Sequence, residues 1–170
     1  MSKKRVIIFI DHANVYKNLE LVSGRIDWNK FKQELKKDNH LVGTLIYIGV
    51  PNPIPANQRK FIKYLERVEY TLRQVEIQEL PDGEKHQKGV DILMFKDIEG
   101  LAKDDAFDKA IIVSGDRDFV EAIRTLKEYK KRFEIWSFKK SLSKKLKKVS
   151  GSNNIHYIDY ILDKIEMRSR

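Results

Sequence analysis

The segment that most constrains the fold is AIIVSGDRDFVEA, residues 110–122. Its first four residues are apolar and mostly β-branched, which predicts a strand buried on both faces. A serine and a glycine then end the strand, and the apolar residues from Phe119 onward have helical spacing. Asp116 and Asp118 therefore follow the carboxyl end of the strand, where open α/β sheets bind ligands. Because the two carboxylates repel each other, we expect a positive group nearby.

Length and composition limit the class of protein. A chain of 170 residues without a linker or repeat predicts one domain, residues 1–170. The absence of cysteine excludes disulfides, thiolate zinc sites and a cysteine nucleophile. The first apolar run is too short for a signal peptide, and no run has membrane-spanning length, so we expect a cytoplasmic protein without a membrane partner. A formal charge of +9 favours polyanionic partners.

The rest of the chain alternates between strand and helix patterns. Strands are expected at Val6–Ile10, Val42–Val50, Val75–Leu80, Ala110–Val113, Phe133–Phe138 and Ile155–Ile158. Helices are expected at residues 15–21, 28–35, 61–72, 91–103, from 119, at 141–149 and at the C-terminus. Asp27 is the expected N-cap of the second helix, and a charged loop, EKHQKG, leads into the fourth. This alternation predicts a three-layer α/β/α fold with a mainly parallel sheet.

The pattern of apolar and polar residues in each strand predicts the order of the strands. The first and fourth strands are the most continuously apolar, so they belong at the centre of the sheet. The third and fifth alternate between apolar and polar residues, which suits the edges. The order 3-2-1-4-5 satisfies both conditions. It places Asp11 and Asp116 at the carboxyl ends of neighbouring central strands.

Three separate segments bring acidic residues toward the carboxyl ends of these central strands. Asp11 ends the first strand in FIDHAN, with Asn14 three residues later, and Asp91 begins a helix in KGVD. Asp116 and Asp118 follow the fourth strand. Carboxylate and amide oxygens are the ligands that Mg²⁺ and Mn²⁺ prefer. A basic protein with an acidic pocket can hold a phosphate chain with its lysines while a metal activates water.

The spaced motifs F-I-D-x-x-N, K-x-V-D and V-S-G-D-x-D-F, from Phe9 to Phe119, resemble the NYN domain in its bacterial LabA-like form, a branch of the PIN-like nuclease superfamily. The resemblance implies a PIN-like fold and a ribonuclease that depends on Mg²⁺ or Mn²⁺ and acts on RNA. It maps the catalytic, metal-binding acids and a polar helper onto Asp11, Asp91, Asp116, Asp118 and Asn14. Asp97 matches a further acidic position. It lies about 120° around the helix from Asp91, so we expect it to support the metal-binding residues rather than to bind the metal itself.

The sequence also departs from the family pattern. His12 and Arg117 stand where the family often has a glycine and a small residue. The Arg117 guanidinium can bind a substrate phosphate, or it can pair with a carboxylate and weaken metal binding. The later S-x-x-L segment is kept as Ser143 and Leu146, but Ser150 and Gly151 replace the acid that often follows it.

Each of these residues also has a structural interpretation. Asp118 begins a D-x-x-E sequence that is typical of a capping box, and Asp91 and Asn14 could each cap a helix. Ser114 is expected to form hydrogen bonds within its turn, behind the acids. Asp11 is harder to explain structurally, because a carboxylate directly after a buried strand is costly without partners.

The segment from residue 139 to 150 carries six lysines. Leu142, Leu146 and Val149 have helical spacing, so this face packs inward and the lysines point outward. Such a surface follows a nucleic-acid backbone with little sequence information. The expected phosphate-binding residues are Lys88, Arg117, Lys144, Lys145 and Lys148.

Three functions remain open at this point. The first is a metal-dependent endoribonuclease that leaves a 5′-phosphate and a 3′-hydroxyl. The second is an RNA-binding regulatory module of the same fold with little or no cleavage. A receiver-like phospho-acceptor domain ranks last, because the usual acidic pair after the first strand is missing, and no glycine-rich turn supports a dinucleotide site. The RNA can be single-stranded or structured, and a homo-oligomer is also open.

Overall fold

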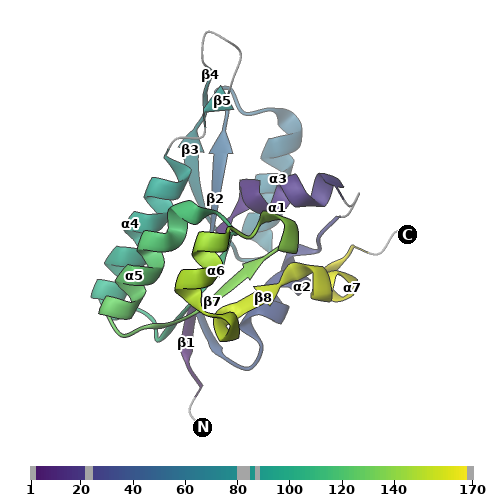
Figure 1. Ribbon diagram of the computed structural model, residues 1–170. Helices are drawn as coiled ribbons and strands as arrows, with labels where there is room; N and C mark the ends of the chain where they lie inside the picture. The colour runs from purple at the N-terminus through teal and green to yellow at the C-terminus, as the bar shows by residue number, and fades with distance from the viewer. Residues whose placement is uncertain (1–2, 22–24, 80–84, 87–88, 168–170) are drawn as a thin grey trace.

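The computed structural model describes residues 3–21, 25–79, 85–86 and 89–167. Its centre is a six-stranded sheet in which every neighbouring pair of strands is parallel (Figure 1). The strands are β1 (Arg5–Asp11), β2 (His40–Val50), β3 (Thr71–Glu76), β6 (Lys109–Val113), β7 (Arg132–Ser137) and β8 (Ile155–Tyr157). Their order, β3-β2-β1-β6-β7-β8, confirms the predicted order of the first five strands. The prediction that the fifth strand lies at an edge is wrong, because β8 pairs with β7 on its outer side.

Helices cover both faces of the sheet, which confirms the three-layer fold. One face packs against α1 (His12–Leu21), α2 (Trp28–Lys36), α3 (Ala56–Arg67) and α7 (Leu162–Ile165). The other face packs against α4 (Val90–Lys103), α5 (Val120–Glu128) and α6 (Lys144–Ser150). Short 3₁₀ helices join these elements at Arg117–Phe119 (η1), Lys139–Ser141 (η2), Ser152–Asn154 (η3) and Ile158–Ile161 (η4).

The central strand β1 is buried from both sides. Ile8 and Ile10 pack into the core that includes α1 and α2, while Ile7 and Phe9 pack into the core that includes α4 and α5. Successive side chains of a strand point to opposite faces, so a continuous apolar run is what a doubly covered strand requires. Its neighbour β6 shows the same division, which confirms that both strands lie at the centre.

The boundary between α3 and β3 differs from the prediction. The apolar spacing from Phe61 to Leu72 predicts one helix, but α3 ends at Arg67 and Leu72 lies in β3. Glu69 has a φ of 66°, and the backbone N–H of Tyr70 donates to the carbonyl of Leu65. A left-handed residue of this kind ends a helix, and the chain then pairs with β2 from Thr71 onward.

The predicted strand Val75–Leu80 is wrong in its bounds. Only its first two residues lie in β3, while β4 (Gln78–Glu79) pairs with β5 (Lys85–His86) as a separate antiparallel hairpin. Part of the expected EKHQKG loop therefore forms a strand. Leu80 and the expected turn at residues 81–83 lie outside the described residues.

The start of α2 confirms a local prediction. The Asp27 side chain accepts a hydrogen bond from the backbone N–H of Lys30 at 3.0 Å, as an N-cap does.

Among the described residues, the structure contains no helix that combines the length and the apolar character needed to cross a membrane.

Candidate functional site

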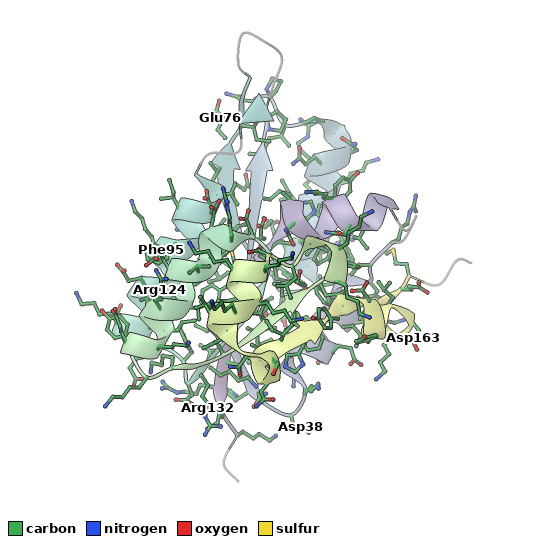
Figure 2. All side chains as sticks on the ribbon, viewed as in Figure 1. Asp38, Glu76, Phe95, Arg124, Arg132 and Asp163 are labelled. Carbon is green, nitrogen blue, oxygen red and sulfur yellow. The ribbon has the colours of Figure 1, made fainter. Side chains whose placement is uncertain are left out.

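The candidate site lies where the chain leaves the two central strands in opposite directions. The connection after β1 enters α1 on one face of the sheet, while the connection after β6 enters α5 on the other. A crevice of this kind, outside the carboxyl ends of the strands, is where open α/β sheets bind ligands. Figure 2 shows Glu76, the last residue of β3, at this carboxyl edge, with Asp38 and Arg132 at the opposite edge.

Asp11 ends β1 and is 9% exposed. Because Ile10 pairs with Val113, Asp11 is level with Ser114, whose hydroxyl donates to Asp11 Oδ2 at 3.1 Å. The backbone N–H of Asn14 lies 3.5 Å from Asp11 Oδ1. Burial raises the pKa of Asp11 to about 6, and the negative charges of two other carboxylates, Asp116 and Asp91, add to the shift. A cation at this position would relieve both effects.

The turn after β6 is fixed by a chain of hydrogen bonds. The backbone N–H of Asp116 donates to Ser114 Oγ at 3.2 Å, which confirms the expected bonding of the serine within its turn. Asp116 Oδ1 in turn accepts from the backbone N–H of Asp118 at 3.0 Å. Asp116 thus caps η1. The capping role proposed for Asp118 at the following helix is wrong, because the N-cap of α5 is Phe119, with no side-chain cap hydrogen bond.

Asn14 ties the two central strands together at this edge. Its side-chain oxygen accepts a hydrogen bond from the backbone N–H of Gly115 at 3.2 Å. The interpretation of Asn14 as a helix cap is wrong, because it lies inside α1, which begins at His12. Its side chain instead holds the β6 turn against the end of β1.

Gly115 is required by close packing. A Cβ atom at this position would come within 3.0 Å of the Ser137 hydroxyl and the Ser141 backbone. The carbonyl of Gly115 also accepts a hydrogen bond from the backbone N–H of Ser143 at 2.8 Å, just before α6. The turn that carries Asp116 is thus clamped between α1 on one side and the segment leading to α6 on the other.

Asp91 lies in the first turn of α4. The N-cap of this helix is Gly89, with a φ of 125°, so the alternative that Asp91 is the cap is wrong. The pKa of Asp118 is raised, chiefly by the charge of Asp116, and also by burial and by the charge and hydrogen bond of Asp91. The Arg117 guanidinium opposes that shift. The helix start is therefore in contact with the turn after β6.

The structure thus brings together the four acids that the sequence singled out. Their donors are all carboxylate oxygens, which suit a hard cation such as Mg²⁺ or Mn²⁺ that keeps several waters. Within the described part of the chain, no three His, Asp or Glu side chains are grouped closely enough to hold an ion by themselves. The donor chemistry suits a divalent metal, but no more than two of these side chains would contact one ion directly, so the rest of its coordination would come from water. We call Asp11, Asp91, Asp116 and Asp118 the acid cluster.

Asp97 forms its side-chain hydrogen bonds with residues of β2 and β3. It accepts a hydrogen bond from the Tyr47 hydroxyl at 2.8 Å and two from the Arg73 guanidinium at 2.9 and 3.1 Å. It therefore links α4 to β2 and β3. None of its hydrogen bonds among the described residues goes to the acid cluster, and a role of Asp97 behind those acids stays a prediction.

The basic segment behaves as its spacing predicts. Leu146 is buried, Leu142 and Val149 are partly buried against the same core, and the lysines at 144, 145, 147 and 148 are exposed. Ser143 caps α6 by accepting from the backbone N–H of Leu146 at 3.2 Å. Arg117 is also exposed. Lys88, the remaining expected phosphate contact, lies outside the described residues.

Sequence reasoning did not locate the group of aromatic side chains beside the acid cluster. The His12 imidazole lies 5.7 Å from Tyr16, 5.9 Å from Trp28 and 5.3 Å from Phe61, measured between ring centroids. Burial lowers the pKa of His12 to about 4. These rings come from α1, α2 and α3, so no local spacing in the sequence reveals that they meet.

Comparison with known proteins identifies the fold. The structure superposes on a crystal structure of a Vibrio parahaemolyticus protein of unknown function with a TM-score of 0.80, 24% identity and 97% of each chain covered. The C-terminal domain of a Pyrococcus furiosus hydrogenase gives a TM-score of 0.47 at 15% identity, over 79% of this chain and 93% of that one, too low for any conclusion. No curated protein matches the chain.

The family comparison covers most of the chain. The NYN domain family matches residues 5–157, from the start of β1 to the end of β8. This range contains the entire acid cluster and the α6 lysines. The LabA-like branch is compatible with these matches and stays a prediction. The chain belongs to the NYN domain family.

Proposed function

We propose that this protein is a divalent-metal-dependent ribonuclease that hydrolyses phosphodiester bonds of RNA. The proposed metal is Mg²⁺ or Mn²⁺, and the proposed mode is endonucleolytic, with a 5′-phosphate and a 3′-hydroxyl as products. Membership in the NYN domain family supports a nuclease-type fold. The expected compartment remains the cytoplasm.

The observation that carries this proposal is the acid cluster. Carboxylates from β1, α4 and the β6 turn lie close enough to raise the pKa values of Asp11 and Asp118. Such mutual repulsion costs stability, and perturbed acids in a crevice are typical of functional sites. Asp11, Asp91, Asp116 and Asp118 are the proposed metal-binding residues, with at most two of them contacting one ion directly and the others acting through bound water. Bound there, the metal would supply an activated water and neutralise charge on the phosphate.

The chain's own residues would orient and bind. Asn14 and Ser114 fix the positions of Asp116 and Asp11 through the hydrogen bonds of the β6 turn. The exposed lysines of α6 and Arg117 lie on the two segments that meet at Gly115, so both can contact the phosphates of one RNA strand. The turn therefore couples the position of the acids to that of the basic surface.

One observation favours an RNA-binding module with weak or no cleavage as a second candidate. The charge of Arg117 lowers the pKa of Asp118 and so offsets part of the repulsion that a metal would relieve. An arginine in this place can compete with a cation for the carboxylates. In that case the fold and the basic surface are kept for binding.

Cleavage assays on the full chain test the proposal. A panel of single-stranded and structured RNAs is incubated with Mg²⁺ or Mn²⁺, and with EDTA in parallel. Asp116→Asn is compared with Asp104→Asn, an exposed aspartate at the far end of α4. We expect wild type and Asp104→Asn to cleave, and both EDTA and Asp116→Asn to abolish cleavage.

The two candidates give different outcomes. If no RNA in the panel is cleaved, while salt-sensitive RNA binding persists in wild type and in Asp116→Asn, the nuclease proposal is wrong and the binding module remains. If cleavage survives EDTA, the acid cluster does not act through a metal.

A further inference from the structure

A pocket opens beside the acid cluster, on the other side of the first turn of α1. Its volume is about 890 Å³, within the usual range for small-ligand sites. Its walls come from α1, the start of α2, the carboxyl end of β2 and α3. These elements lie on the face of the sheet opposite α4 and α5 (Figure 1). We call it the aromatic pocket.

The walls of the aromatic pocket are flat rings. His12 and Tyr16 lie nearly parallel, with 22° between their planes and 5.7 Å between their centroids. Phe61 and Trp28 meet at a steeper angle behind them, 5.9 Å apart. Trp28 is almost fully buried, whereas Tyr16 is 53% exposed. An aromatic ring of that size, exposed on a pocket wall, offers a stacking surface.

Part of the pocket lining is polar and positive. Asn57 and Gln58 lie at the start of α3, and their amides can both donate and accept hydrogen bonds. Lys17 on α1 and Arg25 before α2 add positive charge to the lining. Flat rings and cations in one lining match the chemistry of a nucleotide, which has a flat base and an anionic phosphate.

The start of α1 joins the pocket to the acid cluster. Asp11 accepts its hydrogen bond from Ser114 on the β6 side. The next residue, His12, packs against Phe61 on the α3 side. Consecutive Cα atoms are about 3.8 Å apart. A strand that places a phosphate at the acid cluster therefore has the pocket directly beside it.

We infer that the aromatic pocket holds an unpaired nucleobase of the RNA, stacked on Tyr16 and His12, next to the phosphate that lies at the acid cluster. This inference rests on the proposed function and narrows its substrate to RNA that is single-stranded at that nucleotide. Bases within an A-form duplex stay stacked on each other, whereas unpaired bases can turn out onto aromatic side chains. Because every base has a π-face, stacking of this kind tolerates any sequence.

The test measures binding rather than cleavage. The full chain is titrated in EDTA against a fluorescently labelled single-stranded RNA of mixed sequence, and against an abasic ribose-phosphate chain of equal length. The variants are Tyr16→Ala, Tyr16→Phe and, as a matched control, Tyr129→Ala. Tyr129 is an exposed tyrosine that follows α5, three residues before β7 begins at Arg132.

Loss of the Tyr16 ring should weaken binding of the RNA about tenfold. The affinity for the abasic chain should not change, because that chain has only phosphates and sugars to offer. Tyr16→Phe and Tyr129→Ala should both bind like wild type. If these binding results are obtained but no RNA is cleaved in Mg²⁺, the inference about the pocket is supported and the nuclease proposal is wrong.

Other results overturn the inference. An equal loss for both chains, or no loss for either, means that the pocket does not hold a base. Failure of wild type to bind RNA has the same meaning. A Tyr16→Ala variant that sediments as a monomer while wild type sediments as a dimer identifies the pocket as an interface between two copies of the chain.

Discussion

Aspartates at the two ends of the parallel strands, which we call the amino edge and the carboxyl edge of the sheet, have pKa values shifted in opposite directions. At the amino edge, Asp108 accepts hydrogen bonds from the backbone and guanidinium of Arg5 at 2.8 and 2.9 Å. Asp105 pairs with Arg5 and Lys131. These bonds lower the pKa of Asp108 to about 2. At the carboxyl edge, burial and neighbouring acids raise the pKa of Asp11 to about 6.

The difference separates structural acids from candidate functional ones. A carboxylate whose pKa falls on folding stabilises the fold when it is ionised, and one whose pKa rises destabilises it. At the amino edge, Asp105 and Asp108 are each matched with a cation from the chain itself. The carboxyl edge gathers four acids and sets one exposed arginine among them. We therefore expect mutations at the two edges to affect stability and activity in opposite directions.

The largest expected effect comes from neutralising one acid at each edge. Asp11→Asn should lower RNA cleavage at least about 100-fold, since it removes a proposed metal ligand. It should also raise the free energy of unfolding at pH 8 in EDTA by about 1–3 kcal/mol, because the buried charge is removed. Asp108→Asn should leave cleavage unchanged and lower stability by about 1 kcal/mol, since solvent screens this half-exposed pair.

Urea unfolding and initial cleavage rates measure both quantities. If Asp11→Asn were destabilised as much as Asp108→Asn, burial and repulsion would not dominate at the carboxyl edge, and the contrast between the edges would be lost.

The second effect is a pair of opposite pH dependences at the carboxyl edge. The pKa of His12 is about 4 in the folded chain and 6.5 as an ordinary histidine. As the pH falls from 6.5 to 4, the unfolded chain binds this proton first, so His12 costs about 3 kcal/mol of stability. The pKa of Asp11 rises from 3.8 to about 6, so the folded chain binds that proton first and gains stability over the same range.

Removing one of the two groups should therefore leave the pH dependence of stability that the other group causes. His12→Phe keeps a ring among the aromatic side chains and should gain stability relative to wild type at pH 4.5 compared with pH 7. Asp11→Asn should lose stability relative to wild type over the same interval. The measurement is urea unfolding at both pH values, and parallel profiles for the two variants would contradict the assigned pKa shifts.

The third effect comes from substituting alanine for glycine in the β6 turn and, for comparison, inside α4. Gly115→Ala should destabilise the fold by about 1–3 kcal/mol and reduce cleavage, because its methyl group meets the Ser141 backbone. Gly100→Ala lies inside α4 with no atom within 4 Å of the new methyl group. It should stabilise the helix by about 0.5–1 kcal/mol without a change in cleavage. Thermal unfolding and cleavage rates distinguish the two, and equal behaviour would show that the turn is not clamped.

The smallest effect concerns the α6 lysines. Lys144, Lys145 and Lys148 are exposed, so each alanine variant should fold like wild type. Each should bind RNA more weakly and lower the slope of log affinity against log salt by about 1. Lys103→Ala, at the far end of α4, is the control and should keep the wild-type slope. A salt slope that is unchanged in all three variants would remove α6 from the RNA-binding surface.

The central strands and the acids were predictable from the sequence because their signals are local. A continuous apolar run defines β1 and β6, and an acid that follows such a run within three residues lies at the carboxyl ends of the strands. The parallel order then follows from which strands are most apolar. Asp11 and Asp116 were placed correctly for that reason.

Features that depend on distant residues were not predictable. The helix pattern through Leu72 continues past the left-handed Glu69, which ends α3. The contact of Asp97 with Arg73 joins α4 to β3, and Asp118 lies inside η1 rather than at the N-cap of α5, because a 3₁₀ turn capped by Asp116 precedes that helix. The rings of the aromatic pocket come from three helices, so only the folded chain brings them together.

The most direct test of a divalent cation site is metal binding without RNA. Isothermal titration calorimetry measures Mn²⁺ binding to wild type, Asp116→Asn and Asp108→Asn at neutral pH. We predict that wild type and Asp108→Asn bind Mn²⁺ and that Asp116→Asn does not. If wild type fails to bind, or if Asp116→Asn binds as well as wild type, the acid cluster is not a metal site.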